Sequence, residues 1–266
     1  MLRRMVIPAS ILVLGSAALV AAAVPASAAP RQVVRPSGYR PGGPMIRVAG
    51  TRSATRGGFT TVQSSNWSGY AVTGGTGAFT SVSASWTEPT ATCPSRTAQY
   101  ASFWVGLDGY SSGSVEQTGT DADCSGHTPV YYGWYEMYPA YPVNFSNTVK
   151  PGDQMSASVT FSGTASYTLV LRDATRGWTQ TVLATQSGLA RSSAEAITEA
   201  PSSNSGVLPL ADFGTVSYSV SAANGTSLGS QNPIEIVMVD KSGRDKDSTS
   251  PISGAGAFSD TWLRSN

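Results

Sequence analysis

The apolar runs of this 266-residue chain are short, and this restricts its fold more than any other feature. After residue 60 the runs are rich in β-branched and aromatic residues and end at Gly, Ser, Asn or Pro, as strands do. No stretch keeps a helical period over the length of a typical helix. We expect strands at residues 67–72, 79–86, 100–107, 115–120, 130–138, 154–162, 167–173, 180–184, 193–199, 215–222 and 235–239. So many short strands predict one all-β domain over residues 60–266, an antiparallel sandwich or barrel.

Three polar segments between these strands are predicted to be turns. Residues 173–177 and 223–226 combine Asp or Asn with Gly, as tight turns do. Residues 109–113 match the G-x-S-x-G pattern of serine hydrolases, but that motif needs a helix after it. A strand pattern follows here, so we interpret this segment as a hairpin turn.

Charge is divided unevenly along the chain. Charged residues make up 12% of it, against about a quarter in an average protein. Residues 29–59 hold six Arg and no acid, whereas the chain from residue 60 holds nine bases and sixteen acids, a net charge of −7. The whole chain has a net charge of +1, which gives no support for binding to nucleic acid.

The first 28 residues have the pattern of a secretory signal peptide. Arg3 and Arg4 precede an apolar stretch at residues 7–24, and the Ala-Ser-Ala sequence at 26–28 is typical of a cleavage site. An uncleaved membrane anchor is the alternative, and the short apolar core argues against it. No later run is apolar and long enough to span a membrane. We therefore expect a secreted, extracellular protein that is not held in a membrane after signal cleavage.

Residues 29–59 contain four Pro, several Gly and the six Arg, without the apolar period that a core needs. One interpretation is a basic linker or tail. The other is a pro-segment whose Arg side chains lie over an acidic site until the segment is removed. Its attraction to the body would then fade in acid, because Asp and Glu become protonated while Arg does not. Salt would weaken the attraction as well.

The two cysteines, Cys93 and Cys124, are expected to pair. An exported protein meets an oxidising environment, and the disulfide would close a loop of about thirty residues. A metal site is the alternative, but it needs more ligands, and the chain has a single histidine, His127.

That single histidine also narrows the chemistry. A Ser-His-Asp hydrolase would have to use His127, and a zinc hydrolase needs several His. The sequence contains no pair of Asp-Thr/Ser-Gly loops, no phosphate-binding loop and no dinucleotide-binding fingerprint. Carboxylates and amides remain as catalytic groups, and we expect neither a metal nor a cofactor.

Four acids lie within apolar or aromatic strand patterns: Asp108, Glu136, Glu195 and Glu199. Strand alternation puts Glu136 between two aromatic residues on one face, and puts Glu195 on the same face as Glu199. Such acids are either exposed on a partly aromatic surface or line a cleft, where burial shifts their pKa values.

Five runs, taken in order, resemble the glutamic peptidases, or eqolisins. They are S-N-W-S-G-Y at 65–70, W-V-G-L-D-G at 104–109, E-Q-T-G at 116–119, W-Y-E-M-Y-P at 134–139 and A-E-A-I-T-E at 194–199. The resemblance extends from residue 65 to near the C-terminus. It implies a sandwich of two large antiparallel sheets, similar to the concanavalin-A-like lectins and glucanases. It also implies a secreted, acid-acting endopeptidase that is made as a proprotein.

The resemblance assigns roles to single residues. The catalytic pair would be Gln117, in the Q-T-G run, and Glu199, the last residue of the A-E-x-I-x-E run, with Glu195 only its neighbour. The residues that support the substrate cleft would be Trp67, Trp104, Asp108, Trp134 and Glu136. One departure is Tyr132, which stands where fungal members carry Asp and leaves the local hydrogen-bond network open. The cysteine pair also differs from theirs.

These roles fit peptide hydrolysis. Glu199 would take a proton from water and return it to the leaving amine, while the Gln117 amide stabilises the oxyanion. Because a base must stay ionised in acid, we expect hydrogen bonds to hold the pKa of Glu199 down. The expected partners are protein or peptide substrates and the chain's own pro-segment, and the expected state is a monomer. Two other functions remain: a sandwich that binds or cleaves carbohydrate with paired acids, and a non-catalytic cell-surface sandwich, which would need neither member of the pair.

Overall fold

The computed structural model describes residues 35–49, 53–56 and 58–266. The expected signal peptide, residues 1–28, and residues 29–34 of the expected pro-segment lie outside the described residues. In the described part, no helical segment has the length and apolar character needed to cross a membrane.

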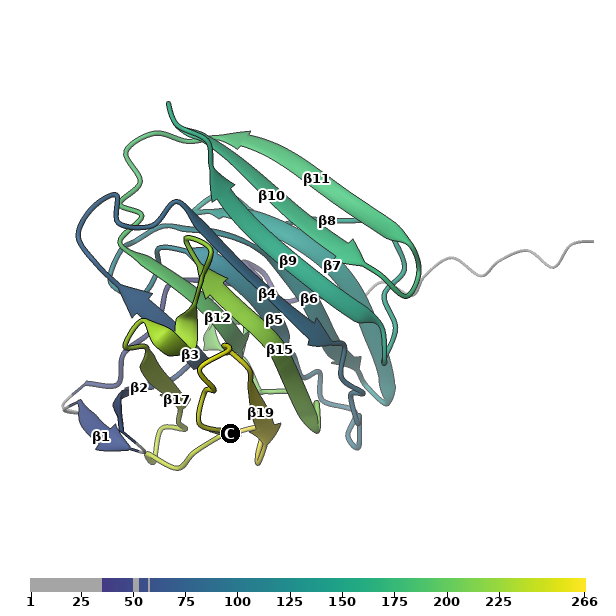
Figure 1. Ribbon diagram of the computed structural model, residues 1–266. Helices are drawn as coiled ribbons and strands as arrows, with labels where there is room; N and C mark the ends of the chain where they lie inside the picture. Colours follow the sequence, from purple (N-terminus) through teal and green to yellow (C-terminus); the bar gives the residue numbers. More distant parts are fainter. Residues whose placement is uncertain (1–34, 50–52, 57) are drawn as a thin grey trace, which may run out of the picture. The chain divides into compact units, whose positions relative to one another are not determined.

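Most of the described chain forms two large sheets that lie face to face (Figure 1). The larger sheet has nine strands. Their spatial order is β1 (Ala54–Arg56), β2 (Phe59–Ser64), β17 (Ile234–Met238), β3 (Trp67–Thr73), β12 (Ser193–Glu199), β5 (Ser102–Leu107), β6 (Val115–Ser125), β7 (Thr128–Tyr138) and β8 (Val143–Asn144). Neighbouring strands are antiparallel, except that β17 and β2 run parallel.

The smaller sheet faces the larger one. Its order is β11 (Trp178–Thr185), β10 (Ser166–Asp173), β9 (Gln154–Phe161), β4 (Ser81–Thr87), β15 (Thr215–Ala223), β19 (Phe258–Trp262) and β18 (Asp247–Thr249), with β16 (Thr226–Ser227) paired to β15. A separate hairpin joins β13 (Ser202–Ser203) and β14 (Gly206–Val207), and one 3-10 turn, η1, covers Leu228–Ser230.

The main core lies between the two sheets and follows from strand alternation. In β4, Val82, Ala84 and Trp86 are buried, and the residues between them are half-buried. From the larger sheet, Phe103 and Leu107 of β5 join the same apolar cluster. Each strand therefore contributes every second side chain to this core, as period-two patterning requires.

Four central strands of the larger sheet depart from this alternation. Strands β3, β12, β5 and β6 are buried at nearly every position, so the outer face of the sheet is covered as well. A second apolar cluster lies there, built around Trp67, Trp104 and Trp134, and it includes Met45 from the N-terminal segment. Antiparallel sheets commonly leave one face to water. Here a part of the chain with the composition of a linker covers that face.

The predicted all-β sandwich is confirmed, and each of the eleven predicted strands is present, with ends that differ by a few residues. The predicted turns are confirmed too: Asn224 and Gly225 have φ values of 51° and 75°, and the Gly177 amide donates to the Asp173 carbonyl. Strand β6, and no helix, follows residues 109–113. The strands that the sequence does not predict are mostly two or three residues long.

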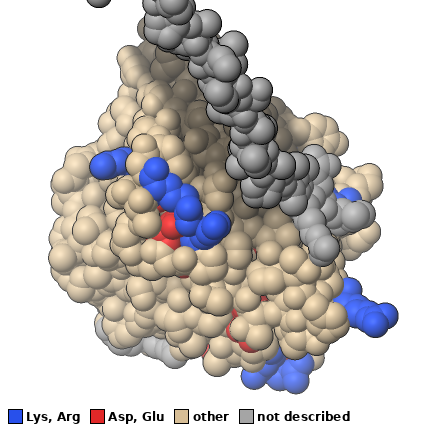
Figure 2. All heavy atoms as spheres, turned by 90° about the vertical axis from the view of Figure 1, so that its right-hand side faces the viewer, with Lys and Arg blue, Asp and Glu red and all other residues tan. Residues whose placement is uncertain are grey.

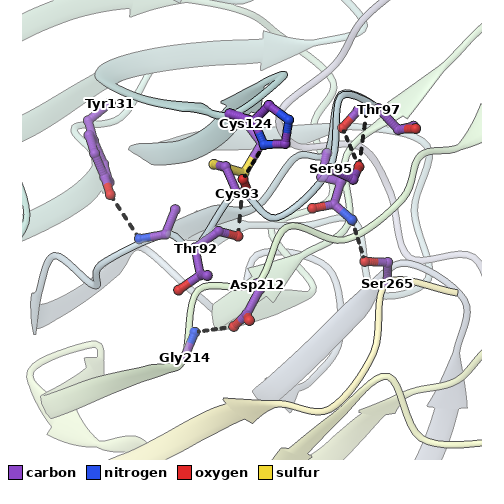
Figure 3. The surroundings of a disulfide bond; sticks show 12 residues. Thr92, Cys93, Ser95, Thr97, Cys124, Tyr131, Asp212, Gly214 and Ser265 are labelled. Carbon is purple, nitrogen blue, oxygen red and sulfur yellow. Dashed lines mark hydrogen bonds between the residues drawn. A yellow bond between two sulfur atoms is a disulfide. The ribbon is translucent and has the colours of Figure 1, made fainter.

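The expected disulfide is present, and it joins Cys93 to Cys124 near the end of β6 (Figure 3). The two Cα atoms are 5.5 Å apart, and the sequence separation is 31. His127 lies beside this bond, where its Nδ1 atom is 3.2 Å from the Cys93 carbonyl oxygen. The single histidine therefore contacts the backbone of a loop.

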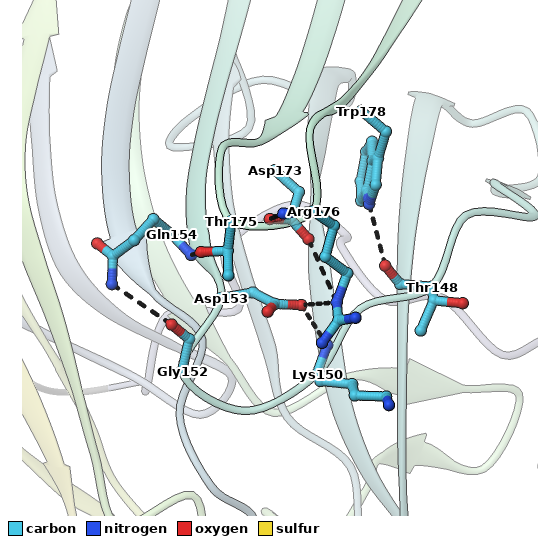
Figure 4. A network of polar contacts seen from close by, with 9 residues as sticks. All are labelled: Thr148, Lys150, Gly152, Asp153, Gln154, Asp173, Thr175, Arg176 and Trp178. Atoms are coloured by element: carbon cyan, nitrogen blue, oxygen red, sulfur yellow. Dashed lines mark hydrogen bonds and ion pairs between the residues drawn. The ribbon is translucent and has the colours of Figure 1, made fainter.

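A polar network ties the turn between β10 and β11 to the start of β9 (Figure 4). The Arg176 guanidinium donates to Asp153 at 2.5 Å and lies 3.8 Å from Asp173. Asp153 also accepts from the Lys150 backbone amide. The Asp153 carboxylate thus links two loops that lie about twenty residues apart in the sequence. A hydrophobic pattern alone does not predict such a contact.

We expect removal of the disulfide to lower the free energy of unfolding. In the double variant Cys93→Ala/Cys124→Ala, the unfolded chain regains the freedom of a closed loop of 31 residues, worth about 3–4 kcal/mol in the chain-entropy model. Urea denaturation measures this loss. Wild-type protein unfolded with a reductant should lose the same amount, and an unchanged denaturation midpoint in both would contradict the prediction.

Candidate active site

The β-sheet register brings Gln117 and Glu199 to the same region of the larger sheet. Glu199 ends β12 and pairs with Ser102 of β5, while Gln117 of β6 pairs with Gly106 of the same strand. Strand β5 therefore lies between the two side chains. Both are fully buried on the outer face of the sheet, beside the second apolar cluster.

Both side chains contact one peptide bond, the one between Gly42 and Gly43. The Gln117 Nε2 group donates to the Gly42 carbonyl oxygen at 2.7 Å. On the other side, the Gly43 amide donates to Glu199 Oε1 at 3.3 Å. One peptide unit thus has its carbonyl oxygen on Gln117 and its nitrogen on Glu199.

Glu199 is surrounded by hydrogen-bond donors. Besides Gly43, the Asn66 side chain donates to its Oε1 at 3.1 Å, and the Trp104 indole donates to its Oε2 at 3.1 Å. Burial nevertheless raises the pKa of Glu199 well above its ordinary value, and these three donors oppose the rise. Our expectation that hydrogen bonds hold this pKa down is therefore wrong for the covered site, because loss of water around the carboxyl outweighs them.

Gln117 is held by Glu136 on the neighbouring strand. Its Nε2 group donates to Glu136 Oε2 at 3.2 Å, and the Arg40 guanidinium donates to Glu136 Oε1 at 2.8 Å. Burial raises the pKa of Glu136 to about 8, and Arg40 acts against the rise. The Gln117 carbonyl oxygen accepts from no described protein group. Glu136 therefore fixes the direction of the amide and leaves its oxygen available.

The three predicted tryptophans form the floor of the site. Trp67 and Trp104 pack edge to face, with ring centroids 5.0 Å apart, and the Trp67 indole donates to the Gly43 carbonyl at 2.9 Å. Trp134 lies further along and donates to Asp121 at 2.6 Å. Large rings exclude water here, and each indole N–H is used in a polar contact, as buried tryptophan requires.

Two further acids, Asp108 and Glu195, lie outside this arrangement. Asp108 is one of the predicted cleft residues, and Glu195 is the neighbour of Glu199 in its sequence run. Asp108 follows β5 with φ 71° and accepts from the backbone amides of Arg191 and Ser192, so it fastens the loop before β12. Glu195 is buried on the same face as Glu199, and in the described part no hydrogen bond joins it to the Gly42–Gly43 peptide. Asp108 therefore holds the loop before β12 in place. Glu199, and not Glu195, is the glutamate that binds the Gly42–Gly43 peptide.

Sequence reasoning missed Asn66, Asp121 and Asp123 as site residues. Asn66 belongs to the S-N-W-S-G-Y run, so that run contained the signal. The two Asp residues lie on β6 beyond the predicted strand end at residue 120, because Asp is disfavoured in strands and reads as a turn. The Tyr132 hydroxyl lies within hydrogen-bond distance of both carboxyl groups, and its contact with Asp123 is 2.6 Å long.

The segment of residues 35–48, here called the covering segment, lies along this face of the sheet. Its backbone bonds to the body at several points: Arg40 forms an antiparallel bridge with Ser202, and the Met45 amide donates to the Gly109 carbonyl. The Tyr39 and Met45 side chains are buried. The segment is therefore docked by main-chain bonds and side chains together.

At Gly42 the covering segment lies very close to Gln117. A Cβ atom added there would lie 2.2 Å from Gln117 Oε1, whereas a Cβ atom on Gly43 would meet no atom within 4 Å. Neither glycine has a positive φ. Only the absence of a side chain at residue 42 lets its carbonyl reach the Gln117 amide.

Many carboxyl groups are buried around this sheet, although the surface carries few charged residues (Figure 2). Burial raises the pKa of Glu88 to about 8 and that of Glu116 to about 9. Within the described residues, no group of three His, Cys, Asp or Glu side chains could hold a metal ion. At Glu88 and Glu116 burial therefore favours the neutral carboxyl.

The two-sheet sandwich is the fold of solved glutamic peptidases. A crystal structure of scytalido-glutamic peptidase with a transition state analog inhibitor is 27% identical, with a TM-score of 0.65 over 75% of this chain and 98% of that one. SCP-B, a member of the eqolisin family solved with the tripeptide Ala-Ile-His, is 26% identical, with a TM-score of 0.60 over 75% of this chain and 98% of that one.

Sequence comparison agrees. Residues 65–259 match the Peptidase A4 family, and the chain belongs to that family. Aspergillopepsin-2 of Aspergillus niger is 35% identical over 137 residues, which are 49% of this chain and 47% of that protein. The match thus spans less than half the length of this relative. The resemblance to the glutamic peptidases inferred from five sequence runs is confirmed.

We expect the folded protein to be more stable in acid than at neutral pH. A buried carboxyl with a raised pKa binds its proton more tightly in the folded than in the unfolded chain. Its stabilising effect is complete below about pH 4 and is lost as pH rises through the folded pKa, here about 8 for Glu88 and about 9 for Glu116. The free energy of unfolding, measured in urea, should fall from pH 5 to pH 9.

Glu116→Gln tests the cause of this slope. Removing one titrating carboxyl should flatten it by up to about 1.4 kcal/mol per pH unit. Asp240→Asn is the matched control, because hydrogen bonds from Arg244 lower the pKa of Asp240 instead of raising it. An unchanged slope in Glu116→Gln, or equal flattening in both variants, would contradict the prediction.

Proposed function

We propose that this chain is a secreted, acid-acting glutamic endopeptidase that hydrolyses peptide bonds with Gln117 and Glu199. The observation that supports this most is the peptide unit bound between them, with its carbonyl oxygen on one side chain and its amide nitrogen on the other. These are the two atoms of a peptide bond whose charge changes most during hydrolysis. Family membership supports the same activity.

In the proposed reaction, ionised Glu199 takes a proton from a water molecule while the water oxygen attacks the carbonyl carbon. The carbonyl oxygen becomes an oxyanion and accepts from the Gln117 Nε2 group. Protonated Glu199 then gives its proton to the amide nitrogen, the carbon–nitrogen bond breaks, and a carboxylic acid and an amine leave. The free carbonyl oxygen of Gln117 is suited to orient the water.

The reaction needs an ionised Glu199, and uncovering the site favours that form. While the covering segment is in place, burial keeps the pKa of Glu199 high. Departure of the segment returns water to the carboxyl, while Asn66 and Trp104 still donate to it. Both effects stabilise the charged form. The base is thus inactive when covered and becomes active when open to substrate.

We further propose that residues 29–59 are a pro-segment and that its covering segment keeps the enzyme latent. The segment supports this by occupying both members of the pair with a main-chain peptide. With the signal pattern at residues 1–28, it gives a protein exported as a precursor and active outside the cell as a monomer. Its substrates are peptides or unfolded proteins that replace the segment.

Electrostatics contributes to this latency through one ion pair and through the attraction of Arg35 to Asp121 and Asp123. Arg40 pairs with Glu136, which in turn holds Gln117. The guanidinium groups of Arg35 and Arg47 lie instead over the rings of Tyr132 and Tyr110, at 4.3 Å and 4.5 Å from the ring centroids. Because burial raises the pKa of Glu136 to about 8, the Arg40 pair weakens as pH falls through about 8, whereas the cation–π contacts remain. The proposed weakening of the Arg40 pair therefore begins above neutral pH.

Substitution of the pair tests the proposed activity. We expect Gln117→Ala to lower kcat by about 10²–10³-fold, the usual loss for an oxyanion donor, and Glu199→Gln to lower it by about 10²–10⁴-fold, the usual loss for a general base. Hydrolysis of denatured casein between pH 2 and pH 7 measures both, with circular dichroism to show that each variant is folded.

Glu195→Gln is the matched control for Glu199→Gln, because it changes a buried Glu on the same strand and face. It should keep most of the activity. Wild-type hydrolysis by either variant of the pair would refute the assignment. A larger loss in Glu195→Gln than in Glu199→Gln would mean that the wrong Glu has been chosen.

Two glycine variants test the proposed latency. In Gly42→Ala the new methyl group displaces the Gln117 amide or the segment, and either movement breaks their hydrogen bond. Overpacking of this kind costs about 1–3 kcal/mol, so we expect Gly42→Ala to be at least about tenfold more active than wild type at pH 6. Gly43→Ala has open space and should stay latent. Equal latency of the two variants, or equal activity, would contradict the mechanism.

A further inference from the structure

The Tyr39 side chain of the covering segment enters a pocket in the body of the protein. It is 5% exposed, and its hydroxyl donates to Asp121 Oδ2 at 2.5 Å. Its ring packs against Tyr100, with centroids 5.3 Å apart, and its hydroxyl lies 3.3 Å from that of Tyr132. The body of the protein therefore contacts both the ring and the hydroxyl of Tyr39.

The walls of this pocket belong to the body and are held independently of Tyr39. Asp121 is fully buried and accepts from the Trp134 indole and the Tyr132 hydroxyl. The Tyr132 hydroxyl also lies within hydrogen-bond distance of Asp123, which fixes its ring. A wall built in this way keeps its shape when the covering segment leaves, so the acceptor on Asp121 stays directed at the same place.

The pocket lies at a fixed distance from the candidate catalytic pair. Asp121 is four residues after Gln117 on β6 and on the same face, about 13 Å away along an extended strand. Tyr39 is three residues before Gly42, about 10 Å along an extended segment. The covering segment thus runs antiparallel to this part of β6, with the Gly42–Gly43 peptide at one contact and Tyr39 at the other.

We propose that Asp121, Tyr132 and Tyr100 form a tyrosine-binding subsite, which holds Tyr39 in the latent chain and accepts a substrate tyrosine four residues before the bond that is cut. This inference rests on the proposed function. It also gives Tyr132 a role: the residue that departs from the fungal pattern positions the acceptor of the subsite.

The polar partner of the subsite selects a hydroxyl over the other side chains of similar size. Phenylalanine would fill the same space but leave the buried Asp121 carboxyl with one donor fewer, and sites built to bond a hydroxyl reject analogues that lack it. A lysine or arginine would need a charged partner, whereas burial raises the pKa of Asp121 and favours its neutral form in acid. The neutral phenol of tyrosine donates a hydrogen bond and needs no charged partner.

Competition by synthetic peptides tests the subsite directly. The peptide of residues 35–48 should inhibit casein hydrolysis by the full chain after activation in acid. The Tyr39→Phe peptide should have an inhibition constant about tenfold higher. An Ile46→Ala peptide is the control, because this side chain is exposed, and its constant should stay within about twofold. Equal constants for the unaltered peptide and the Tyr39→Phe peptide would overturn the inference.

The cleavage sites in casein test the substrate side. Mass spectrometry of the products should show tyrosine enriched over phenylalanine four residues before the cut bond, and Asp121→Asn should remove that enrichment. No enrichment with the wild-type enzyme would overturn the inference. The peptide comparison above uses only wild-type enzyme, so it decides the matter even if Asp121→Asn does not fold.

A third measurement separates failure of the subsite from failure of the proposed function. Hydrogen exchange of residues 39–43 in the full chain at pH 6 needs no catalysis. Tyr39→Phe should speed this exchange about tenfold, and Ile46→Ala should not change it. Absence of peptidase activity would refute the proposed function alone. Unchanged exchange in Tyr39→Phe would refute the subsite alone.

Discussion

The hydrogen bond from Gln117 to the Gly42 carbonyl links the two parts of the structure. The larger sheet carries buried polar groups on its outer face, and a buried amide or carboxyl needs a partner to avoid a cost of about 1–3 kcal/mol. The main chain of the covering segment supplies those partners to both Gln117 and Glu199. Because the partner is a peptide group, the same surface suits any extended polypeptide. The proposed latency and the proposed substrate binding thus use one set of contacts.

Buried carboxyl groups make the structure around this surface more stable in acid than at neutral pH. Glu136, Glu199 and Asp121 are all fully buried near the site, and burial raises the pKa of each. In acid they are neutral, so little repulsion or desolvation opposes folding. Glu136 becomes charged only as pH rises through about 8, and the covering segment places Arg40 beside that charge. The segment therefore compensates the negative charge that forms at Glu136.

Much of the sandwich could be predicted from sequence, because β-branched and aromatic runs mark its long strands. Gln117 and Glu199 could be predicted as well, since each lies in a run shared with known peptidases. The docking of Gly42 and Gly43 could not: it depends on main-chain atoms, and glycine and proline in the sequence indicate only a linker. Asp121 was missed for a related reason, because a polar residue late in a strand reads as the end of the strand. Sequence patterns do not predict contacts made by backbone atoms or by buried polar groups.

The position of β2 limits how far the chain can be shortened. This strand pairs in parallel with β17, whose other neighbour is β3. Trimming into residues 59–64 would leave β17 as an open sheet edge, a row of unpaired amides and carbonyls on which other chains can add strands. A break between the covering segment and Phe59 frees the site without opening that edge. The sheet itself therefore sets a boundary for the proposed maturation, and aggregation is the expected result of crossing it.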